Sequence, residues 1–133
     1  MFKRGPVPPL VHGVLDYVIA AILIAAPFVL SFDEDAAIAL AIVAGLAVLL
    51  LGAFTAWTTG IVKSIPPVAH AMLDYLLGIF LVIAPFLLGF NDDDTASAFF
   101  VILGIAGLLL TVATRFTPEA GEPRRPRRQA ARP

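Results

Sequence analysis

His12-Gly13-Val14-Leu15-Asp16-Tyr17 is the stretch that decides the fold, because the chain repeats it as His70-Ala71-Met72-Leu73-Asp74-Tyr75. Both copies begin a long apolar run, and these runs lead to Ala26-Pro27-Phe28 and to Ala84-Pro85-Phe86. Self-similarity at a fixed spacing is the signature of a repeated structural unit. The chain is therefore one unit used twice.

The match between the two copies extends well beyond these motifs. At an offset of 58 residues, Pro8-Pro9 aligns with Pro66-Pro67. The second copy then has one extra residue in an acidic loop, and at an offset of 59 residues Gly45 aligns with Gly104 and Thr55 with Thr114. The repeat thus continues from the start of one apolar run to the end of the next.

The composition is that of a membrane protein. Of the 133 residues, 59% are hydrophobic and 14% are charged, and the mean hydropathy is +0.93. A helix needs about 20 apolar residues to cross a bilayer core. Four uncharged runs are long enough or nearly so, at 18–32, 36–62, 75–90 and 95–114. We therefore expect an all-α bundle of four transmembrane helices, built from two tandem helical hairpins that enter the membrane from the same side.

The repeat also sets the expected organisation of the chain. We expect helices over 9–32, 36–58 and 66–90, and a fourth from after the acidic loop at 91–94 to near 116. The hairpin repeats then occupy 8–58 and 66–116, with a lead at 1–7, a loop at 59–65 and a disordered basic tail at 117–133. The start of the chain is interpreted as a helix rather than a cleaved signal peptide, because the same segment recurs internally.

Prolines and small residues mark special positions within the expected helices. Pro27 and Pro85 each remove a backbone hydrogen bond late in a helix, so each either kinks that helix or marks its end. Small residues let membrane helices approach closely. Those expected to pack against neighbouring helices or partners are Ala37, Ala41, Gly45, Gly104 and Gly107.

The charges predict the orientation in the membrane. In a four-crossing arrangement every basic residue lies on one side, including Lys63 and Arg115, and the two loops on the other side are acidic. The positive-inside rule places that basic side, with both termini, in the cytoplasm. Trp57 and Phe116 fall at the inner ends of two helices and are expected in an interfacial aromatic belt.

The arginine-rich tail at 117–133 is expected to contact anionic lipid headgroups. A docking segment for an acidic partner or for nucleic acid is the alternative. Aromatic residues are not interleaved with these arginines, which argues against specific binding of nucleic acid. Since the chain has no cysteine, disulfides and thiolate chemistry are excluded.

The repeated His-x-x-x-Asp-Tyr is the motif that could carry chemistry. His12 and Asp16 are four residues apart and share a helix face, as do His70 and Asp74. Ionisable groups at this depth are expected to face the bundle interior and to have partners. The imidazoles can pair with carboxylates inside each helix or across the pseudo-twofold axis, and the hydroxyls of Tyr17 and Tyr75 can complete either network.

Four roles are open to this cluster. It can be a polar clamp between helices, a haem or divalent metal site, a proton relay or, least favourably, a hydrolase site that lacks a nucleophile. The clamp is the preferred interpretation. We therefore predict no catalytic residues, no cofactor and no metal, with His12 and His70 as weak candidates for metal ligands.

A short motif near the end of the first helix of each unit resembles the SPW-repeat family of small bacterial integral membrane proteins. The family's Ser-Pro-Trp corresponds to Ala26-Pro27-Phe28 and Ala84-Pro85-Phe86, followed by Val29-Leu30-Ser31-Phe32 and Leu87-Leu88-Gly89-Phe90. Both copies replace the serine and the tryptophan. The resemblance implies a bacterial membrane protein with a repeated two-helix unit, and it brings no activity or catalytic residues.

Taken together, the sequence predicts a non-enzymatic structural or accessory membrane protein that packs with itself or with a larger membrane complex. The alternative is a cofactor-binding, metal-binding or ion-conducting module built on the paired His-Asp sites.

Overall fold

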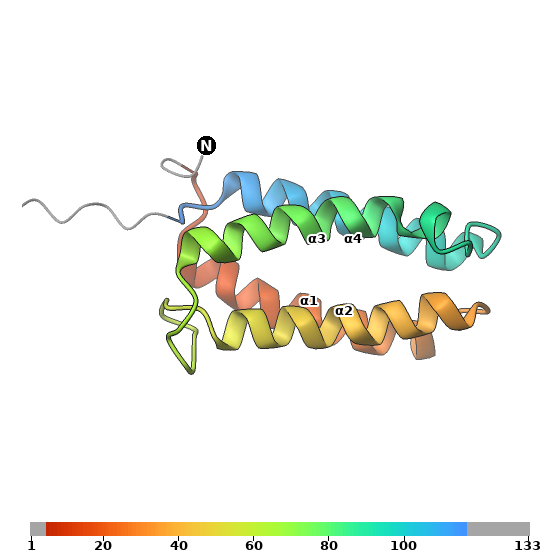
Figure 1. Cartoon of the computed structure of the whole chain (residues 1–133), viewed down its shortest axis with the longest axis horizontal. Helices are drawn as coiled ribbons and strands as arrows, with labels where there is room; N and C mark the ends of the chain where they lie inside the picture. Colours follow the sequence, from red (N-terminus) through yellow and green to blue (C-terminus); the bar gives the residue numbers. More distant parts are fainter. Residues whose placement is uncertain (1–4, 117–133) are drawn as a thin grey trace, which may run out of the picture.

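The computed structural model describes residues 5–116 and contains four helices in a bundle (Figure 1). They are α1 (Pro9–Val29), α2 (Asp35–Ala53), α3 (Pro67–Leu87) and α4 (Asp94–Ala113). The expected lead residues Lys3 and Arg4 and the basic tail at 117–133 lie outside the described residues. The predicted all-α bundle of four helices is confirmed.

The helices are arranged as two antiparallel hairpins, α1 with α2 and α3 with α4 (Figure 1). Between the hairpins, α1 contacts α4 and α2 contacts α3. One core runs through both hairpins, and its fully buried members include Leu23 of α1, Ala41 of α2, Ala84 of α3 and Phe100 of α4. The tandem repeats therefore fold as two equivalent hairpins that share a core.

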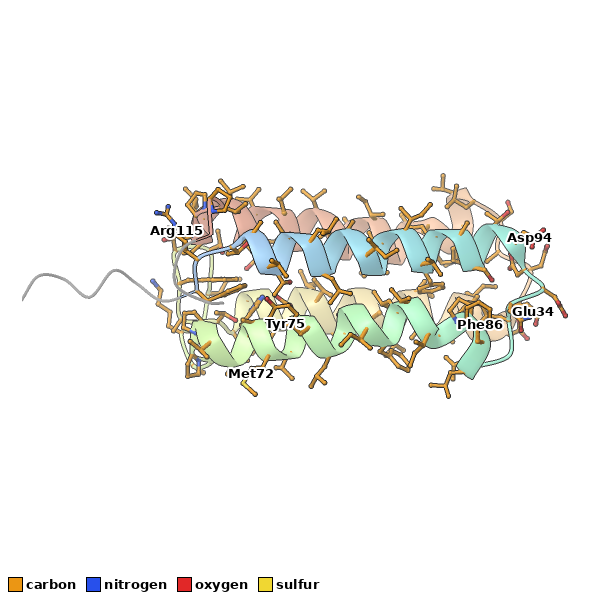
Figure 2. The ribbon with its side chains drawn as sticks, turned by 90° about the horizontal axis from the view of Figure 1, so that it is seen from above. Glu34, Met72, Tyr75, Phe86, Asp94 and Arg115 are labelled. Carbon is orange, nitrogen blue, oxygen red and sulfur yellow. The ribbon has the colours of Figure 1, made fainter. Side chains whose placement is uncertain are left out.

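All four helices are long and apolar enough to cross a membrane. The outward faces of the bundle carry large apolar side chains, as Figure 2 shows along its length. Val29, Phe28 and Phe86 are 69–76% exposed, which is unfavourable in water and favourable against lipid. The protein is therefore a multi-pass membrane protein.

Small residues allow the two helices of each hairpin to approach closely. Ala37 and Ala41 are fully buried, and a Cβ on Gly45 would lie 3.0 Å from the Ala20 carbonyl oxygen of α1. In the second hairpin, a Cβ on Gly104 would lie 2.8 Å from the Gly78 carbonyl oxygen of α3. These small residues therefore serve contacts inside the hairpins, and they do not form surfaces open to a partner.

Gly107 differs from the other small residues that were expected to pack. A Cβ at this position would meet no atom within 4 Å, and Gly107 lines a small cavity between the helices. The lack of a side chain at Gly107 therefore leaves space inside the bundle and does not serve a close contact between helices.

The helices are shorter than the sequence led us to expect, because specific turns end them. We name the two ends of the bundle by their loops: the outer end carries the loops at 30–34 and 88–93, and the inner end carries the loop at 54–66. At the outer end of α1, Leu30 caps the helix, Ser31 has a φ of 52° and the Phe32 N–H donates to the Pro27 carbonyl oxygen at 3.1 Å. This is a Schellman turn, in which one residue in the left-handed conformation reverses the chain. Pro27 thus lies inside the helix, two residues before its end.

The second repeat ends α3 in the same way. Gly89 has a φ of 75°, and the Phe90 N–H donates to the Pro85 carbonyl oxygen at 2.9 Å. Phe32 and Phe90, which follow the left-handed residues, are both buried in the core. The repeated Pro-Phe-x-x-Ser/Gly-Phe is therefore a turn that ends a helix and returns an aromatic ring to the core.

The inner ends of α2 and α4 are shortened by contacts with the start of the partner repeat. Thr55 pairs with Ile65, and Thr114 pairs with Val7, each in a short parallel bridge. The Ile65 N–H donates to the Phe54 carbonyl oxygen at 2.8 Å, and the Val7 N–H donates to the Ala113 carbonyl oxygen at 2.9 Å. The chain leaves the helix to make these bonds, so the expected helical ends near 58 and 116 were too long.

The outer loops are joined through Asp93, which precedes α4. Its carboxylate accepts from the Ala96 N–H at 2.9 Å, which caps α4, and from the Asp33 N–H at 2.8 Å and the Glu34 N–H at 3.3 Å in the other hairpin. Burial by itself raises the pKa of Asp93, but these N–H donors outweigh it and lower the pKa below its ordinary value of 3.8.

The left-handed residues provide a matched pair of substitutions. A side chain in this conformation costs about 1–2 kcal/mol and glycine avoids that cost, so Ser31→Gly should stabilise the protein and Gly89→Ala should destabilise it by about 1 kcal/mol. Thermal unfolding in detergent micelles measures both effects. Equal changes of the same sign in the two variants would contradict the turn assignment.

Asp93 predicts a pH dependence at the outer end. Because its pKa is lowered on folding, its stabilisation is full above the ordinary value of 3.8 and is lost as the pH falls through the lower folded value. Asp93→Asn should lower the melting temperature at neutral pH, and the difference from the parent should shrink in acid. Asp92→Asn, at an exposed neighbour, is the control. A difference that does not change with pH would refute the role of the charge.

Candidate functional site

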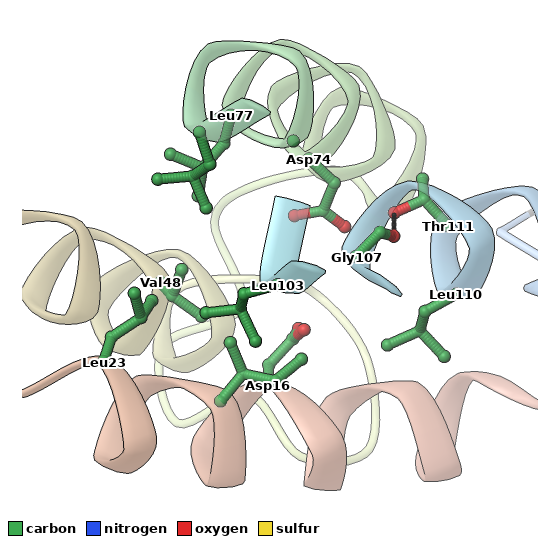
Figure 3. A pocket seen from close by; sticks show the side chains of 12 residues that line it. Asp16, Leu23, Val48, Asp74, Leu77, Leu103, Gly107, Leu110 and Thr111 are labelled. Atoms are coloured by element: carbon green, nitrogen blue, oxygen red, sulfur yellow. Dashed lines mark hydrogen bonds between the residues drawn. The ribbon is translucent and has the colours of Figure 1, made fainter. Parts of the chain in front are cut away.

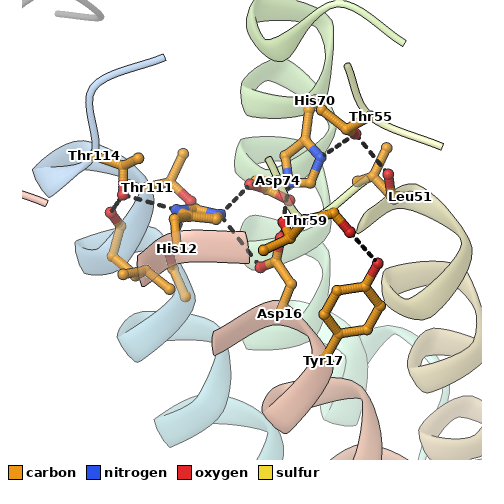
Figure 4. A network of polar contacts seen from close by, with 12 residues as sticks. His12, Asp16, Tyr17, Leu51, Thr55, Thr59, His70, Asp74, Thr111 and Thr114 are labelled. Carbon is orange, nitrogen blue, oxygen red and sulfur yellow. Dashed lines mark hydrogen bonds and ion pairs between the residues drawn. The ribbon is translucent and has the colours of Figure 1, made fainter. Parts of the chain in front are cut away.

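The candidate site is the cluster of His12 and Asp16 on α1 with His70 and Asp74 on α3, at the inner end of the bundle (Figure 4). Both histidines are fully buried and Asp16 is 4% exposed. Each pair lies one helical turn apart, so its two side chains project from the same face of the helix. Because α1 and α3 turn these faces toward each other, the two His-Asp pairs meet on the long axis of the bundle.

Each imidazole lies beside both carboxylates. His12 Nε2 is 3.2 Å from Asp16 Oδ1 and 3.1 Å from Asp74 Oδ2. His70 Nε2 is 3.1 Å from Asp16 Oδ2 and 3.1 Å from Asp74 Oδ2. The structure thus combines the two arrangements that the sequence left open, because pairing occurs both within each helix and across the repeats.

Two threonines complete the cluster, and the sequence analysis did not identify them as site residues. His12 Nδ1 lies 2.7 Å from Thr114 Oγ1, and His70 Nδ1 lies 2.7 Å from Thr55 Oγ1. Each histidine therefore contacts the threonine of the other repeat. The signal that could have found them was the alignment of Thr55 with Thr114, both polar residues at the end of an apolar run.

The threonine hydroxyls determine which ring nitrogen carries a proton. Thr55 Oγ1 donates to the Leu51 carbonyl oxygen at 2.6 Å, and Thr114 Oγ1 donates to the Leu110 carbonyl oxygen at 2.7 Å. A hydroxyl has a single proton, so each oxygen can only accept from the imidazole. Both rings therefore carry a proton on Nδ1 and direct Nε2 toward the carboxylates.

Two atoms at the centre of the cluster lack a well-formed hydrogen bond. His70 Nε2 and Asp16 Oδ2 are buried and 3.1 Å apart, yet neither has a hydrogen-bond partner of acceptable geometry. Buried polar groups are usually satisfied, and each exception requires a reason. The cluster therefore brings its polar atoms close together, but not all of them form hydrogen bonds.

Aromatic rings cover the cluster at the inner end of the bundle. The Trp57 ring centroid lies 4.3 Å from that of His70 and 5.4 Å from that of His12, and the Phe116 centroid lies 5.1 Å from that of His12. Trp57 is 6% exposed and Phe116 is 1% exposed. The expected interfacial belt was wrong for these two residues, because packing on the imidazoles buries them.

Tyr17 of the repeated motif does not complete the network in the expected way. Tyr17 Oη donates to the Thr59 carbonyl oxygen at 2.7 Å in the inner loop, away from the imidazoles (Figure 4). Tyr75 is half-buried on α3, and Figure 2 shows it near the inner end. Tyr17 therefore links the loop that contains Thr59 to α1 by a hydrogen bond.

A cavity of about 40 Å³ lies on the outer side of the carboxylates (Figure 3). Asp16 and Asp74 form one end of it, and Thr111 donates its hydroxyl to the Gly107 carbonyl oxygen at 2.8 Å. The remaining lining consists of glycine and apolar side chains, namely Ile19, Leu23, Val48, Leu77, Gly78, Leu81, Leu103, Gly107 and Leu110. This volume is too small for a haem and offers no polar path through the outer half of the described bundle.

The geometry separates the chemical roles considered for the cluster. The nearby hydroxyls of Thr55 and Thr114 are already bonded to carbonyl oxygens, which leaves neither free to act as an activated nucleophile. His12, His70 and Asp74 each offer an atom within 4.8 Å of the others, a spacing that suits a metal ion. The arrangement can therefore act as a polar clamp or as a ligand set.

Comparison with known families agrees with the repeat. The family model described as SPW repeat domain matches residues 10–114. The chain belongs to the SPW repeat family. Comparison with curated proteins and with solved structures gave no match. The match includes the His-Asp cluster and both threonines, so the site lies within the SPW repeat domain.

The named motif of the SPW repeat domain falls at the outer end of α1 and α3, and the His-Asp cluster lies at the inner end of the same helices. In this SPW repeat protein the motif residues Ala26-Pro27-Phe28 and Ala84-Pro85-Phe86 precede the Schellman turns. The motif therefore shapes the fold and does not contact the polar site.

A double-mutant cycle tests the contact between repeats. Combining His12→Ala with Thr114→Val should show a coupling free energy of about 0.6 kcal/mol and at most about 1.7 kcal/mol, the mean and maximum for hydrogen bonds between membrane helices. Unfolding in mixed micelles provides the four free energies. Tyr17→Phe replaces Thr114→Val in the control cycle, where coupling should be near zero. Equal coupling in the two cycles would argue against a specific His12–Thr114 bond.

Proposed function

We propose that this protein is a non-enzymatic structural or accessory subunit of the bacterial cytoplasmic membrane, which packs with itself or with a larger membrane complex. The observation that carries the proposal is the distribution of side chains. Apolar residues are exposed along all four helices, while the described polar groups gather in the inner cluster and at the two ends. Such a molecule offers extensive surface to lipid and to other membrane helices.

The absence of an activated nucleophile in the cluster supports a non-enzymatic role. The threonine hydroxyls donate to carbonyl oxygens, and the imidazoles are held between threonines and carboxylates. The cavity beside the cluster has a volume of about 40 Å³, which is small for an organic substrate. These features favour a cluster that stabilises the bundle over one that transforms a ligand.

The distribution of charge supports cytoplasmic termini. Arg115 lies at the end of the bundle where the described chain begins and ends, and Glu34 and Asp94 lie at the opposite end (Figure 2). Lys63 lies in the loop between α2 and α3, at the same end as Arg115. Basic residues are enriched in cytoplasmic loops. We therefore assign the His-Asp cluster to the cytoplasmic half of the membrane.

The lack of cysteine allows a direct test of this orientation. Ser64→Cys in the inner loop and Asp92→Cys in the acidic loop each introduce a single exposed thiol. In spheroplasts a membrane-impermeant maleimide should label Asp92→Cys at once, and it should label Ser64→Cys only after permeabilisation. The reverse pattern would overturn the orientation.

Association is tested with the full chain in native membranes. Two differently tagged copies are expressed together, extracted as native lipid discs and purified through one tag. Recovery of the second tag, or of a defined membrane protein at fixed stoichiometry, is the expected result. A disc mass that corresponds to one copy, with neither the second tag nor another protein at stoichiometric amount, would contradict the accessory role.

A further inference from the structure

We infer that the His-Asp cluster is a binding site for a divalent transition metal ion such as Zn²⁺, which locks the two repeats together. The ligands are His12 Nε2, His70 Nε2 and Asp74 Oδ2, with an Asp16 oxygen in the fourth position. The inference goes beyond the proposed accessory role and does not depend on it. A metal-locked bundle can be an accessory subunit or can act alone.

The spacing of the donor atoms suits a tetrahedral ion. His12 Nε2, His70 Nε2 and Asp74 Oδ2 lie within 4.8 Å of one another, and each nitrogen is 3.1 Å from the Asp74 oxygen. Zinc bound at about 2.0–2.1 Å by tetrahedral nitrogen and oxygen ligands separates them by about 3.3–3.4 Å. The two nitrogen–oxygen distances are within a few tenths of an ångström of that geometry. Binding would draw the remaining donors, including the Asp16 oxygen, toward the ion.

The protons are arranged for metal binding. Because the threonine hydroxyls donate to the Leu51 and Leu110 carbonyl oxygens, each imidazole must donate Nδ1–H to its threonine. In the metal-free protein a proton on Nε2 lets His12 donate to Asp74 Oδ2 at 3.1 Å. A divalent ion would replace the Nε2 proton and bind the lone pair that this leaves directed toward the carboxylates. Histidine ligands commonly donate their other N–H in this manner, which fixes the ring and selects the ligating nitrogen.

The two poorly bonded atoms at the centre supply an independent reason. Once Nε2 has lost its proton, an imidazole nitrogen and a carboxylate oxygen 3.1 Å apart are both acceptors, and they repel unless a cation lies between them. His70 Nε2 and Asp16 Oδ2 are such a pair, since both are buried and neither has a hydrogen-bond partner of acceptable geometry. A metal ion would bind both atoms.

The surroundings indicate a structural rather than a catalytic ion. Two histidines and two aspartates fill four positions, and structural zinc sites are closed in this way. Two carboxylates also balance the charge of a divalent ion, which favours its burial. Trp57 and Phe116 cover the imidazoles from the inner end. Each repeat supplies one histidine and one aspartate, so the complete site forms only when the repeats meet.

The first test uses the full chain purified in mild detergent. After chelation and removal of the chelator, titration with Zn²⁺ should show one ion bound per chain and a rise in melting temperature. Co²⁺ should bind in its place and give the intense visible absorption of a tetrahedral complex. If neither ion binds at one per chain, or if binding leaves the melting temperature unchanged, the inference is overturned.

The second test locates the ion. Asp16→Asn combined with Asp74→Asn, and separately His12→Gln, should abolish the tetrahedral Co²⁺ spectrum. Thr55→Val and Thr114→Val should weaken binding by about 10–100-fold, as expected when the group that orients a ligating histidine is removed. Tyr17→Phe removes a hydroxyl that does not contact the imidazoles and should leave affinity unchanged.

The variants also separate this site from other acidic groups. If the chain binds Zn²⁺ as tightly in the Asp16→Asn, Asp74→Asn double variant as in the parent, the ion lies elsewhere and the inference is wrong. A double variant that does not fold is replaced by the threonine variants, whose ligands are intact. Parent-like affinity in both of those would likewise overturn the assignment. None of these outcomes bears on the copy number of the protein in membranes.

Discussion

The burial of two imidazoles and two carboxylates inside an apolar bundle is the constraint on which the structure depends. Ionisable groups in a membrane are costly unless they are paired. His12 and Asp74 belong to different repeats, yet their side chains lie 3.1 Å apart. Because neither repeat can provide all the partners of its own histidine, the two hairpins must associate to satisfy them.

The exchange of partners between repeats explains the form of the inner end. Each threonine lies just past a helix end, where a parallel bridge to the start of the other repeat holds it beside the imidazole. The outer end is joined differently. There the second acidic loop has one extra residue, and the contact between hairpins is made by Asp93 of that loop. Its carboxylate caps α4 and accepts hydrogen bonds from two N–H groups of the other hairpin. The inner end therefore keeps the pseudo-twofold arrangement, and the outer end departs from it.

Much of this arrangement follows from the sequence, because hydropathy and repetition act over long stretches. They predicted the four helices and the tandem hairpins, and the motifs Ala26-Pro27-Phe28 and Ala84-Pro85-Phe86 led to the resemblance to the SPW repeat family. They also singled out His12, Asp16, His70 and Asp74, since ionisable residues are rare in apolar runs. The sequence did not predict the side-chain contacts between residues that are distant in the chain. Thr55 and Thr114 resemble ordinary residues at helix ends, and Trp57 resembles an interfacial anchor until its ring is seen against the imidazoles.

The most direct measurement is solid-state NMR of the protein in lipid bilayers, with nitrogen labels in histidine and carbon labels in threonine. The chain has two histidines, so each imidazole signal can be assigned with a single variant. The structure predicts that both rings carry a proton on Nδ1, and that Nδ1 of His12 correlates with Thr114 and Nδ1 of His70 with Thr55. Imidazoles that show no contact with threonine, or that are protonated only on Nε2, would contradict a bundle held together by partners exchanged between its repeats.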